Sequence, residues 1–479
     1  MKVVLINPVP MDLSEENPKP KFSSFAEPLG LLYIAGVLEQ NGYEISILDH
    51  GATDYTFAEV IKWIKREEPD VLGISVLTRS FRSGVEIAKL AKKWNPNLPI
   101  ILGNYQTVCA QKILEKYQFI DFCVCGEGEY TMRELLSLMK KESTDYKKVR
   151  GIYYRKNGTI RSTPSRELEQ EIDVFPIPNR KKLEGGEYKM SIGGLKISGE
   201  KSGTIIMSRG CPFQCRFCTV HQRKCRHRTI DNIIEELLLL ESEGYREIMV
   251  MDDNFTLKPN WVKNVCKAIV KEKIDMVFHC EGRIEGTEEM YRYMTKANFK
   301  SVFYGMESAS QPILDYYNKK VTPEKCKLAL KKARKGGLDI LMSSFIIGSP
   351  PERLKDIQKT IEFALKIDVD YAMFHIFEVF PGIEIWDELV NQNKLDPEKY
   401  WETGIRVPEL PWYPYNLEFL TNIIRKTYRK FYSLARPQFL FKQVLHTLKS
   451  SYLRNKLKYL AKDFRGSLRM LDSLSEKRF

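Results

Sequence analysis

The stretch Ser208-Arg-Gly-Cys-Pro-Phe-Gln-Cys-Arg-Phe-Cys218 determines how the rest of this chain is interpreted. Within it, Cys211, Cys215 and Cys218 follow a C-x3-C-x2-C spacing. Ten cysteines placed at random in a chain of this length would produce the triplet roughly 0.004 times. Three thiolates on one short loop can bind three irons of a [4Fe–4S] cluster and leave the fourth iron to an outside ligand.

Two other interpretations of the triplet stay open. Zinc would need a further ligand such as His221 or Cys225, although zinc usually takes paired cysteines or histidines at zinc-finger spacings. Three merely buried thiols fit less well, because the loop is polar and follows the end of a predicted strand. The iron–sulfur cluster is therefore the leading hypothesis.

Strand and helix signals alternate from residue 204, just before the triplet, to about residue 377. Six parallel strands with crossover helices predict a partial, TIM-like (β/α)6 barrel whose active site lies at the carboxyl ends of the strands. The predicted strands are residues 204–208, 248–251, 276–279, 302–304, 341–347 and 372–377, and the helices are 231–243, 259–272, 287–297, 323–335 and 353–366.

A second alternating pattern occupies the amino-terminal third of the chain. Continuous apolar strands separated by amphipathic helices predict an α/β, doubly wound parallel sheet of the flavodoxin-like, Rossmann type. Ligands of such sheets bind beyond the carboxyl ends of the strands. The predicted strands are residues 3–7, 44–48, 71–77, 100–102 and 122–124, with helices at 29–40, 57–67, 83–93 and 108–115.

The pattern divides the chain into four parts. Residues 1–145 form the first α/β domain, and residues 204–385 form the barrel. Between them, residues 146–203 contain a hairpin signal at Asn157-Gly158 and several prolines, which predicts a linker with a hairpin. Residues 386–479 are expected to be mostly helical.

Composition excludes several classes of protein. Apolar residues make up 43% and charged residues 29% of the 479 residues, which is typical of a globular protein rather than a disordered one. No uncharged apolar run approaches the ~20 residues of a membrane-spanning helix, and the first residues contain too short an apolar run for a signal peptide. Ten cysteines are too sparse for a disulfide scaffold. We therefore expect a cytoplasmic protein.

The net charge of +13 is concentrated near the carboxyl terminus. Residues 421–479 carry fifteen Lys or Arg and three acidic residues, which leaves about +1 for the rest of the chain. This distribution argues against a nucleic-acid surface over the whole protein. Segment 440–470 has apolar residues at helical spacing among basic ones, which suits peripheral contact with the anionic inner face of a membrane. A helical cover on the barrel and contact with RNA are the alternatives.

The cysteine motif resembles that of the radical S-adenosylmethionine (SAM) superfamily, over residues 204–385. The resemblance implies that SAM binds the open iron through its amino and carboxylate groups and is cleaved to a 5′-deoxyadenosyl radical after one-electron reduction. Phe217 would lie against the adenine. Further matches at strand ends imply contacts with SAM. These residues are Asp252, Asp253, Arg283, Glu307, Ser308 and Ile347.

The combination with the amino-terminal domain resembles the cobalamin-binding branch of that superfamily. It implies a cobalamin that lies across the strand ends of this domain. The loop after the first strand contains no His, and His50 lies in a different loop, so we expect no axial His on the cobalt. The residues implied in binding are Asn7, Pro8, Ser75, Leu77, Thr78, Gly103, Asn104, Gly126 and Glu127.

The resemblance implies a methyltransferase that uses the radical and methylcobalamin to methylate an unactivated carbon. Radical cyclisation, oxidation or C–C coupling of a lipid-like or tetrapyrrole substrate is the main alternative. The methylthiolation of tRNA and a non-enzymatic cobalamin or electron carrier are weaker ones. A reductant such as flavodoxin or ferredoxin would be a partner. Tyr304, His279 and Glu378 are candidates to line the substrate cavity, with ordinary barrel packing as the alternative.

Overall fold

The computed structural model describes residues 1–11, 13, 26–186, 188–189, 191–192, 195–196, 200–220 and 222–432. The chain forms two compact units. The first contains Met1–Tyr188 and Phe380–Gly404, and the second contains Lys189–Val379 and the chain from Ile405 onward. Most of the segment 146–203, for which the sequence predicts a linker, thus lies in the first unit. The predicted amphipathic segment 440–470 lies outside the described residues.

The first unit is a doubly wound α/β sheet, as predicted. Its strand order is β7-β6-β5-β4-β3-β1-β2-β8. The pairs from β5 to β8 are parallel, and β6 and β7 add an antiparallel hairpin at one edge. The elements are β1 (Lys2–Asn7), α1 (Leu29–Gln40), β2 (Glu44–Asp49), α2 (Phe57–Glu67), β3 (Val71–Ser75), α3 (Phe81–Trp94), β4 (Ile100–Gly103), α4 (Ala110–Lys116), β5 (Phe122–Val124), α5 (Glu129–Lys140), β6 (Ile152–Lys156), β7 (Thr159–Ser162), β8 (Leu183–Glu184), α12 (Glu384–Asn391) and α13 (Pro397–Tyr400).

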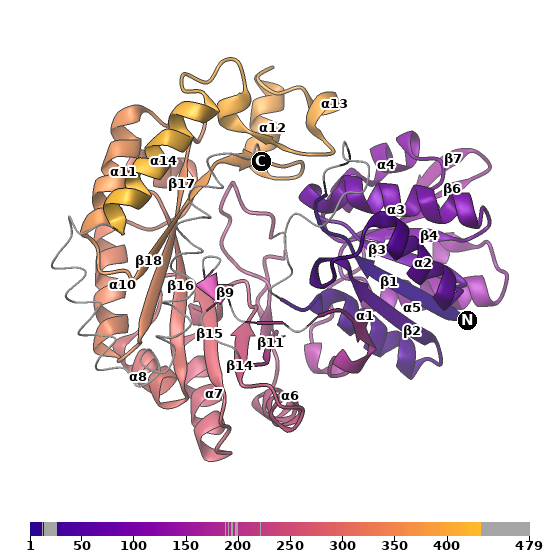
Figure 1. Ribbon diagram of the computed structural model, residues 1–479, viewed down its shortest axis with the longest axis horizontal. Coiled ribbons are helices and arrows are strands. Elements are labelled where there is room, and N and C mark those ends of the chain that lie inside the picture. Colours follow the sequence, from indigo (N-terminus) through magenta and orange to yellow (C-terminus); the bar gives the residue numbers. More distant parts are fainter. Residues whose placement is uncertain are drawn as a thin grey trace. The chain divides into compact units, whose positions relative to one another are not determined.

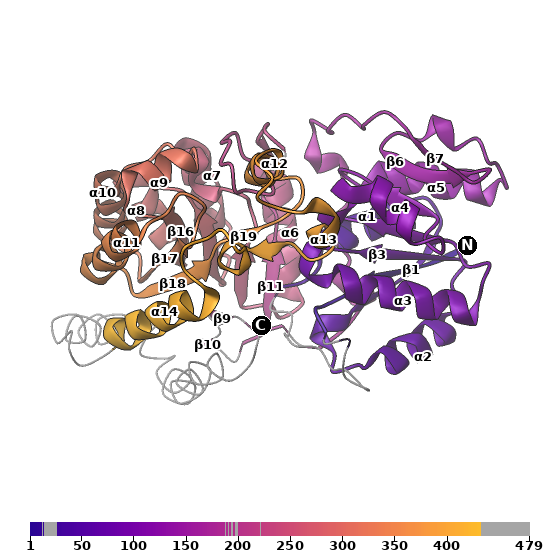
Figure 2. The same cartoon turned by 90° about the horizontal axis from the view of Figure 1, so that it is seen from above.

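Helices cover both faces of this sheet, with α1 beside α5 on one face and α2 beside α3 on the other (Figure 2). The central strand β1 is fully buried from Val3 to Ile6 because both of its faces are covered. Thr56 and Glu59 form a capping box at the start of α2, which explains why the predicted helix begins at Phe57. The strand order reverses between β1 and β3, and this is where sheets of this type bind ligands.

The second unit is a six-stranded, wholly parallel sheet with the order β11-β14-β15-β16-β17-β18. Figure 1 shows the crossover helices α7, α8, α10 and α11 along its outer face. The elements are β9 (Ser191–Ile192), β10 (Leu195–Lys196), β11 (Ser202–Ile205), β12 (Ser208–Arg209), β13 (Arg226–His227), α6 (Ile230–Ser242), β14 (Glu247–Val250), α7 (Pro259–Lys271), β15 (Val277–Gly282), α8 (Glu288–Lys296), β16 (Phe299–Glu307), α9 (Gln311–Tyr316), α10 (Pro323–Lys335), β17 (Ile340–Ile347), α11 (Leu354–Lys366), β18 (Tyr371–Ile376), β19 (Glu378–Val379), β20 (Ile405–Arg406) and α14 (Leu417–Phe431).

The core of the second unit lies between the sheet and its outer helices. Phe278 and Phe299 stack with ring centroids 5.0 Å apart, and Phe255 stacks on Phe299 at 5.3 Å. Because successive strand residues point to opposite faces, this fixes which residues of β15 and β16 face the concave side. The six parallel strands and their crossover helices confirm the partial barrel predicted from the sequence.

The helix α14 covers one end of this barrel. It contacts β18 and α11, and its buried residues include Leu420, Ile424 and Phe431. The first residues of the basic segment 421–479 therefore belong to a helical cover. No helix in the described part of the chain combines the length and the apolar character needed to cross a bilayer.

Candidate active site

The cysteine-bearing loop, residues 210–225 and hereafter the Cys loop, is closed at its base by a short ladder. Ser208 pairs with His227 and Arg209 with Arg226 in the antiparallel strands β12 and β13. Gly210 follows with φ +91°, and a Cβ there would lie 2.5 Å from the carbonyl oxygen of Lys224. The two ends of the loop thus touch, and glycine is required at this position.

Each of the three sulfurs of the C-x3-C-x2-C triplet has an N–H donor nearby. Cys211 accepts from the backbone of Phe213, and Cys218 accepts from the Val220 amide at 3.4 Å. Cys215, which is buried, accepts from Nη1 of Arg283 at 3.4 Å. Such donors stabilise thiolates bound to a metal centre.

The arrangement fits a cluster better than a single ion. Within the described residues, no three His, Cys, Asp or Glu side chains converge so as to hold one metal ion, and His221, a further zinc ligand considered from the sequence, lies outside them. A cubane instead takes each thiolate on a different iron. Burial raises the pKa of the Cys211 and Cys218 thiols, so the positive charge of the irons is what would ionise them.

The outer part of the Cys loop docks on the turn that follows α9. The Arg216 amide donates to the carbonyl of Tyr317 at 3.0 Å, and its guanidinium lies over the Tyr316 ring at 4.7 Å. The Asn318 side chain donates to the carbonyl of Gln214 at 2.7 Å. The loop is therefore held at its tip as well as at its base.

Two of the predicted SAM-binding residues, Asp252 and Asp253, lie at the base of the Cys loop. Asp252 is fully buried and accepts from the Met207 amide at 2.7 Å and the Ser208 hydroxyl at 2.6 Å. Burial raises its pKa to about 7. Asp253 is exposed and accepts from the Gly210 amide at 2.8 Å. Both carboxylates thus position the Cys loop, and their contact with SAM stays a prediction.

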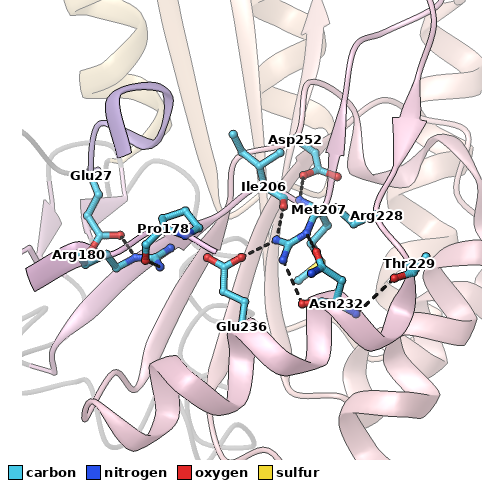
Figure 3. A network of polar contacts seen from close by, with 10 residues as sticks. All are labelled: Glu27, Pro178, Arg180, Ile206, Met207, Arg228, Thr229, Asn232, Glu236 and Asp252. Atoms are coloured by element: carbon cyan, nitrogen blue, oxygen red, sulfur yellow. Dashed lines mark hydrogen bonds and ion pairs between the residues drawn. The ribbon is translucent and has the colours of Figure 1, made fainter. Parts of the chain in front are cut away.

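A buried arginine ties the strand end before the Cys loop to the first crossover helix (Figure 3). Arg228 pairs with Glu236 of α6 at 2.5 Å and also donates to the carbonyl of Ile206 at 2.9 Å. Its Nε donates to the Asn232 side chain at 2.6 Å. A guanidinium suits this task because its donors point in several fixed directions.

Glu307, another predicted SAM contact, forms a buried ion pair. Its Oε1 lies 2.8 Å from Nζ of Lys319, and each side chain is 7% exposed. The backbone of Glu307 has φ +66° at an irregularity of the β16–β17 pairing. Nζ of Lys319 also lies 5.6 Å from the ring of Phe217 in the Cys loop. Sequence reasoning missed Lys319, because nothing local distinguishes it from the neighbouring Lys320.

Two further predicted SAM residues, Ser308 and Ile347, lie in the packed layer at the ends of β16 and β17. The Ser308 hydroxyl is 3.0 Å from that of Thr360 on α11 and accepts from the Ser310 amide at 3.1 Å. Ile347 is fully buried as the last residue of β17. The Ser308 hydroxyl thus forms hydrogen bonds within the protein. Direct contacts of Ser308 and Ile347 with SAM stay predictions.

Side chains along β15 and β16 alternate between the concave side and the helix layer, which separates the residues proposed to line the substrate cavity into two groups. Tyr304 donates to the hydroxyl of Tyr291 on α8 at 2.7 Å, so it faces the helix layer rather than the concave side. His279 faces the concave side and lies 2.7 Å from the Ser301 hydroxyl. For Tyr304 the structure confirms the alternative of ordinary barrel packing, because the register of β16 determines which face each of its residues occupies.

The strand ends of the first unit carry the predicted cobalamin residues. A Cβ at Gly103 or at Gly126 would meet nothing within 4 Å, so the backbone is open there. Thr78 is buried and its hydroxyl has no hydrogen-bond partner. Leu77 is 52% exposed. An open edge with an unpartnered hydroxyl and an apolar side chain fits a flat, amphipathic ligand.

The Asn104 side chain rigidifies this edge. Its amide donates to the Ser75 hydroxyl at 2.9 Å and its oxygen accepts from the Tyr105 amide at 2.7 Å. Asn7 donates to Asp49 at 3.0 Å and Pro8 is buried, so both are engaged within the sheet layer.

Glu127 lies half-buried directly after Gly126. His50 is fully buried with Nε2 2.8 Å from the carbonyl oxygen of Tyr55. Burial lowers the pKa of His50, and the ring lies within the packed structure rather than at the open edge. The roles of all these residues toward cobalamin stay predictions.

Comparisons with known proteins agree with this geometry. Family models of the Radical SAM superfamily and of the B12 binding domain match residues 205–364 and 21–136. An uncharacterized methyltransferase of Pyrococcus horikoshii is 32% identical over 450 residues, which are 93% of this chain and 95% of that protein. The anaerobic magnesium-protoporphyrin IX monomethyl ester cyclase of Rubrivivax gelatinosus is 26% identical over 396 residues, 80% of this chain and 70% of that one.

A solved structure shares the fold. The radical S-adenosylmethionine methyltransferase TsrM from Kitasatospora setae, with cobalamin and a [4Fe-4S] cluster bound, matches with a TM-score of 0.65. The match covers 82% of this chain and 75% of that chain at 17% sequence identity.

Proposed function

Because the chain belongs to the cobalamin-binding branch of the radical SAM superfamily, we propose that it methylates an unactivated carbon of a small or lipid-like molecule. The [4Fe–4S] cluster supplies the electron that cleaves SAM to a 5′-deoxyadenosyl radical, and cobalamin supplies the methyl group. The observation that carries the proposal is the cysteine triplet of the Cys loop, whose three sulfurs each have an N–H donor at the carboxyl ends of a parallel sheet.

The chain's own residues would hold SAM beside that loop. Lys319 offers a buried cation for the SAM carboxylate, in a position fixed by its ion pair with Glu307 at 2.8 Å. Phe217 offers an aromatic face on the same side, 5.6 Å from the ammonium group of Lys319. Asp253 is exposed with one oxygen bonded to the Gly210 amide, so its second oxygen suits the SAM ammonium.

The open strand ends of the first unit would hold cobalamin. The Thr78 hydroxyl is buried and unpartnered and would bond the nucleotide tail. Gly103 and Gly126 leave room for close approach of the ligand to the backbone. No His at this edge is proposed as an axial ligand, since His50 is buried and bonded to Tyr55.

Product analysis tests the proposed methyl transfer. The anaerobically reconstituted protein is supplied with cobalamin, a strong reductant and SAM that carries a deuterated methyl group. We expect both 5′-deoxyadenosine and S-adenosylhomocysteine, together with deuterated methylcobalamin. The Cys215→Ala variant should lose 5′-deoxyadenosine. Formation of 5′-deoxyadenosine without S-adenosylhomocysteine would exclude methylation.

Formation of 5′-deoxyadenosine without S-adenosylhomocysteine would favour the alternative function. Radical cyclisation, oxidation or C–C coupling on the same scaffold is supported by the 26% identity to a protein named as a magnesium-protoporphyrin ester cyclase. Either reaction needs an external one-electron reductant, and we propose a flavodoxin or ferredoxin.

We further propose that the basic segment 421–479 brings the protein to the inner face of an anionic membrane. Its net charge of +12 supports this proposal, because each basic residue near such a surface adds about 1 kcal/mol. Residues 433–479 lie outside the described part of the chain. Co-sedimentation with phosphatidylglycerol vesicles tests it, and equal pelleting of the full chain and of a form that ends at residue 432 would contradict it.

A further inference from the structure

The Arg283 side chain joins the Cys loop to two other segments at the end of the barrel. It follows β15 directly, and its side chain is 7% exposed. Its Nη1 donates to Sγ of Cys215 at 3.4 Å, and its Nη2 donates to the carbonyl oxygen of Lys319. The carbon at the centre of the guanidinium lies 3.7 Å from the centroid of the Phe213 ring.

The backbone of Arg283 is also fixed. Its amide donates to the Asn254 side chain at 3.1 Å, and its carbonyl accepts from the Thr256 hydroxyl at 2.9 Å. Glu285 accepts from Nε at 3.2 Å. Three of the five N–H donors of the guanidinium thus bind protein groups, which holds it in one orientation before any cofactor arrives. A contact of Arg283 with SAM, which the resemblance implies, stays a prediction.

The donors to the three cysteine sulfurs differ in charge. Cys211 and Cys218 accept from backbone amides of Phe213 and Val220. Cys215 accepts from a guanidinium, which carries a full positive charge. Hydrogen bonds to cluster sulfurs and nearby positive charge both favour the more negative, reduced form of an iron–sulfur cluster. The effect is larger at a buried site, where solvent screens less.

We propose that Arg283 is a positioning residue that orients the Cys215 thiolate and raises the reduction potential of the cluster. This inference rests on the proposal that Cys211, Cys215 and Cys218 bind the cluster. A higher potential makes the one-electron reduction that precedes SAM cleavage accessible to a milder reductant.

A potentiometric titration followed by electron paramagnetic resonance (EPR) tests the inference. Wild type, Arg283→Gln and Arg283→Lys are reconstituted anaerobically, and the midpoint of cluster reduction is measured. We expect a more negative midpoint in R283Q and an intermediate one in R283K, because lysine keeps the charge but cannot donate to Cys215 and Lys319 at once. Arg334→Gln is the matched control. Arg334 is also an arginine in an ion pair, with the buried Asp370 as its partner, and its own side chain is 17% exposed.

A wild-type midpoint in R283Q, at four irons per chain, would overturn the inference, and so would an equal shift in R334Q. If R283Q binds fewer than four irons, R283K decides: a shifted midpoint supports the inference and a wild-type midpoint overturns it. The underlying cluster proposal fails in a different way, namely if a variant with all three cysteines replaced by alanine still shows the cluster signal.

Discussion

Glu352 is a residue whose burial predicts a pH-dependent stability. One of its oxygens accepts from the amides of Gly348 and Ser349, and the other has no hydrogen-bond partner. Burial raises its pKa to about 8, whereas the value in an unfolded chain is about 4.3. Between these values the native state keeps a proton that the unfolded state has released. Stability should therefore fall as the pH rises through this window.

Glu352→Gln removes this titration and keeps an acceptor for both amides. Between pH 6 and pH 8.5, wild type should lose at least about 1 kcal/mol of stability relative to E352Q. Denaturant unfolding of both proteins at the two pH values measures this difference. A difference in unfolding free energy that stays constant with pH would contradict the assignment.

Asn104 combines a strained backbone with two hydrogen bonds. Its φ of +76° and ψ of −171° lie in a region that is almost confined to glycine. We expect Asn104→Ala to destabilise the protein by about 1–3 kcal/mol, because it loses the hydrogen bonds to Ser75 and Tyr105 and leaves the backbone strain in place. Asn104→Gly relieves the strain and should be the milder change. Thermal unfolding compares them, and an equal loss in both variants would disprove the role of strain.

The sequence identified the cysteines of this site but not all of their neighbours. The triplet was recognisable because its spacing is local. Lys319 pairs with Glu307, which lies twelve positions earlier on the far side of a turn and a helix, and no spacing rule indicates this contact. Arg283 was assigned to SAM from its place at a strand end, but its direction toward Cys215 depends on the docking of the Cys loop.

At the level of elements, the β12–β13 ladder decides the shape of the Cys loop. Gly210→Ala would place a Cβ 2.5 Å from the carbonyl oxygen of Lys224 at a φ of +91°. We expect G210A to bind fewer than four irons per chain after reconstitution, because the loop ends must separate. Gly30→Ala is the control, since nothing lies within 4 Å of a Cβ there. Full iron content in G210A, measured by colorimetric assay, would show that the closure is dispensable.

Helices could be predicted from the sequence where the hydrophobic periodicity and the capping residues indicate the same boundaries. The helices over 29–40 and 57–67 match α1 and α2, and Thr56 explains the start of the second. The predicted strand 204–208 is instead β11, which ends at Ile205, followed by β12. A ladder of two residues per strand carries too little pattern to be read from sequence, and its pairing depends on contacts across the Cys loop.

At the scale of the whole molecule, both α/β sheets were predictable because buried parallel strands are continuous apolar runs. The edges of the first sheet were only partly predictable. The hairpin around Asn157-Gly158 was predicted and is β6 and β7, but its pairing with β5 and the addition of β8 at the other edge were not. The segment Phe380–Gly404 also joins the first unit. Gln106 donates to the carbonyl of Trp401 at 2.6 Å, a contact between residues 295 positions apart that no local signal indicates.

The central claim is that the Cys loop holds a [4Fe–4S] cluster with one iron open to SAM. EPR spectra of the reduced, anaerobically reconstituted full-length protein, recorded with and without SAM and alongside iron analysis, test it most directly. The account predicts four irons per chain and a cluster signal that changes when SAM is added, with both lost in the Cys215→Ala variant. A protein that holds only zinc, or a cluster signal that SAM leaves unchanged, would contradict it.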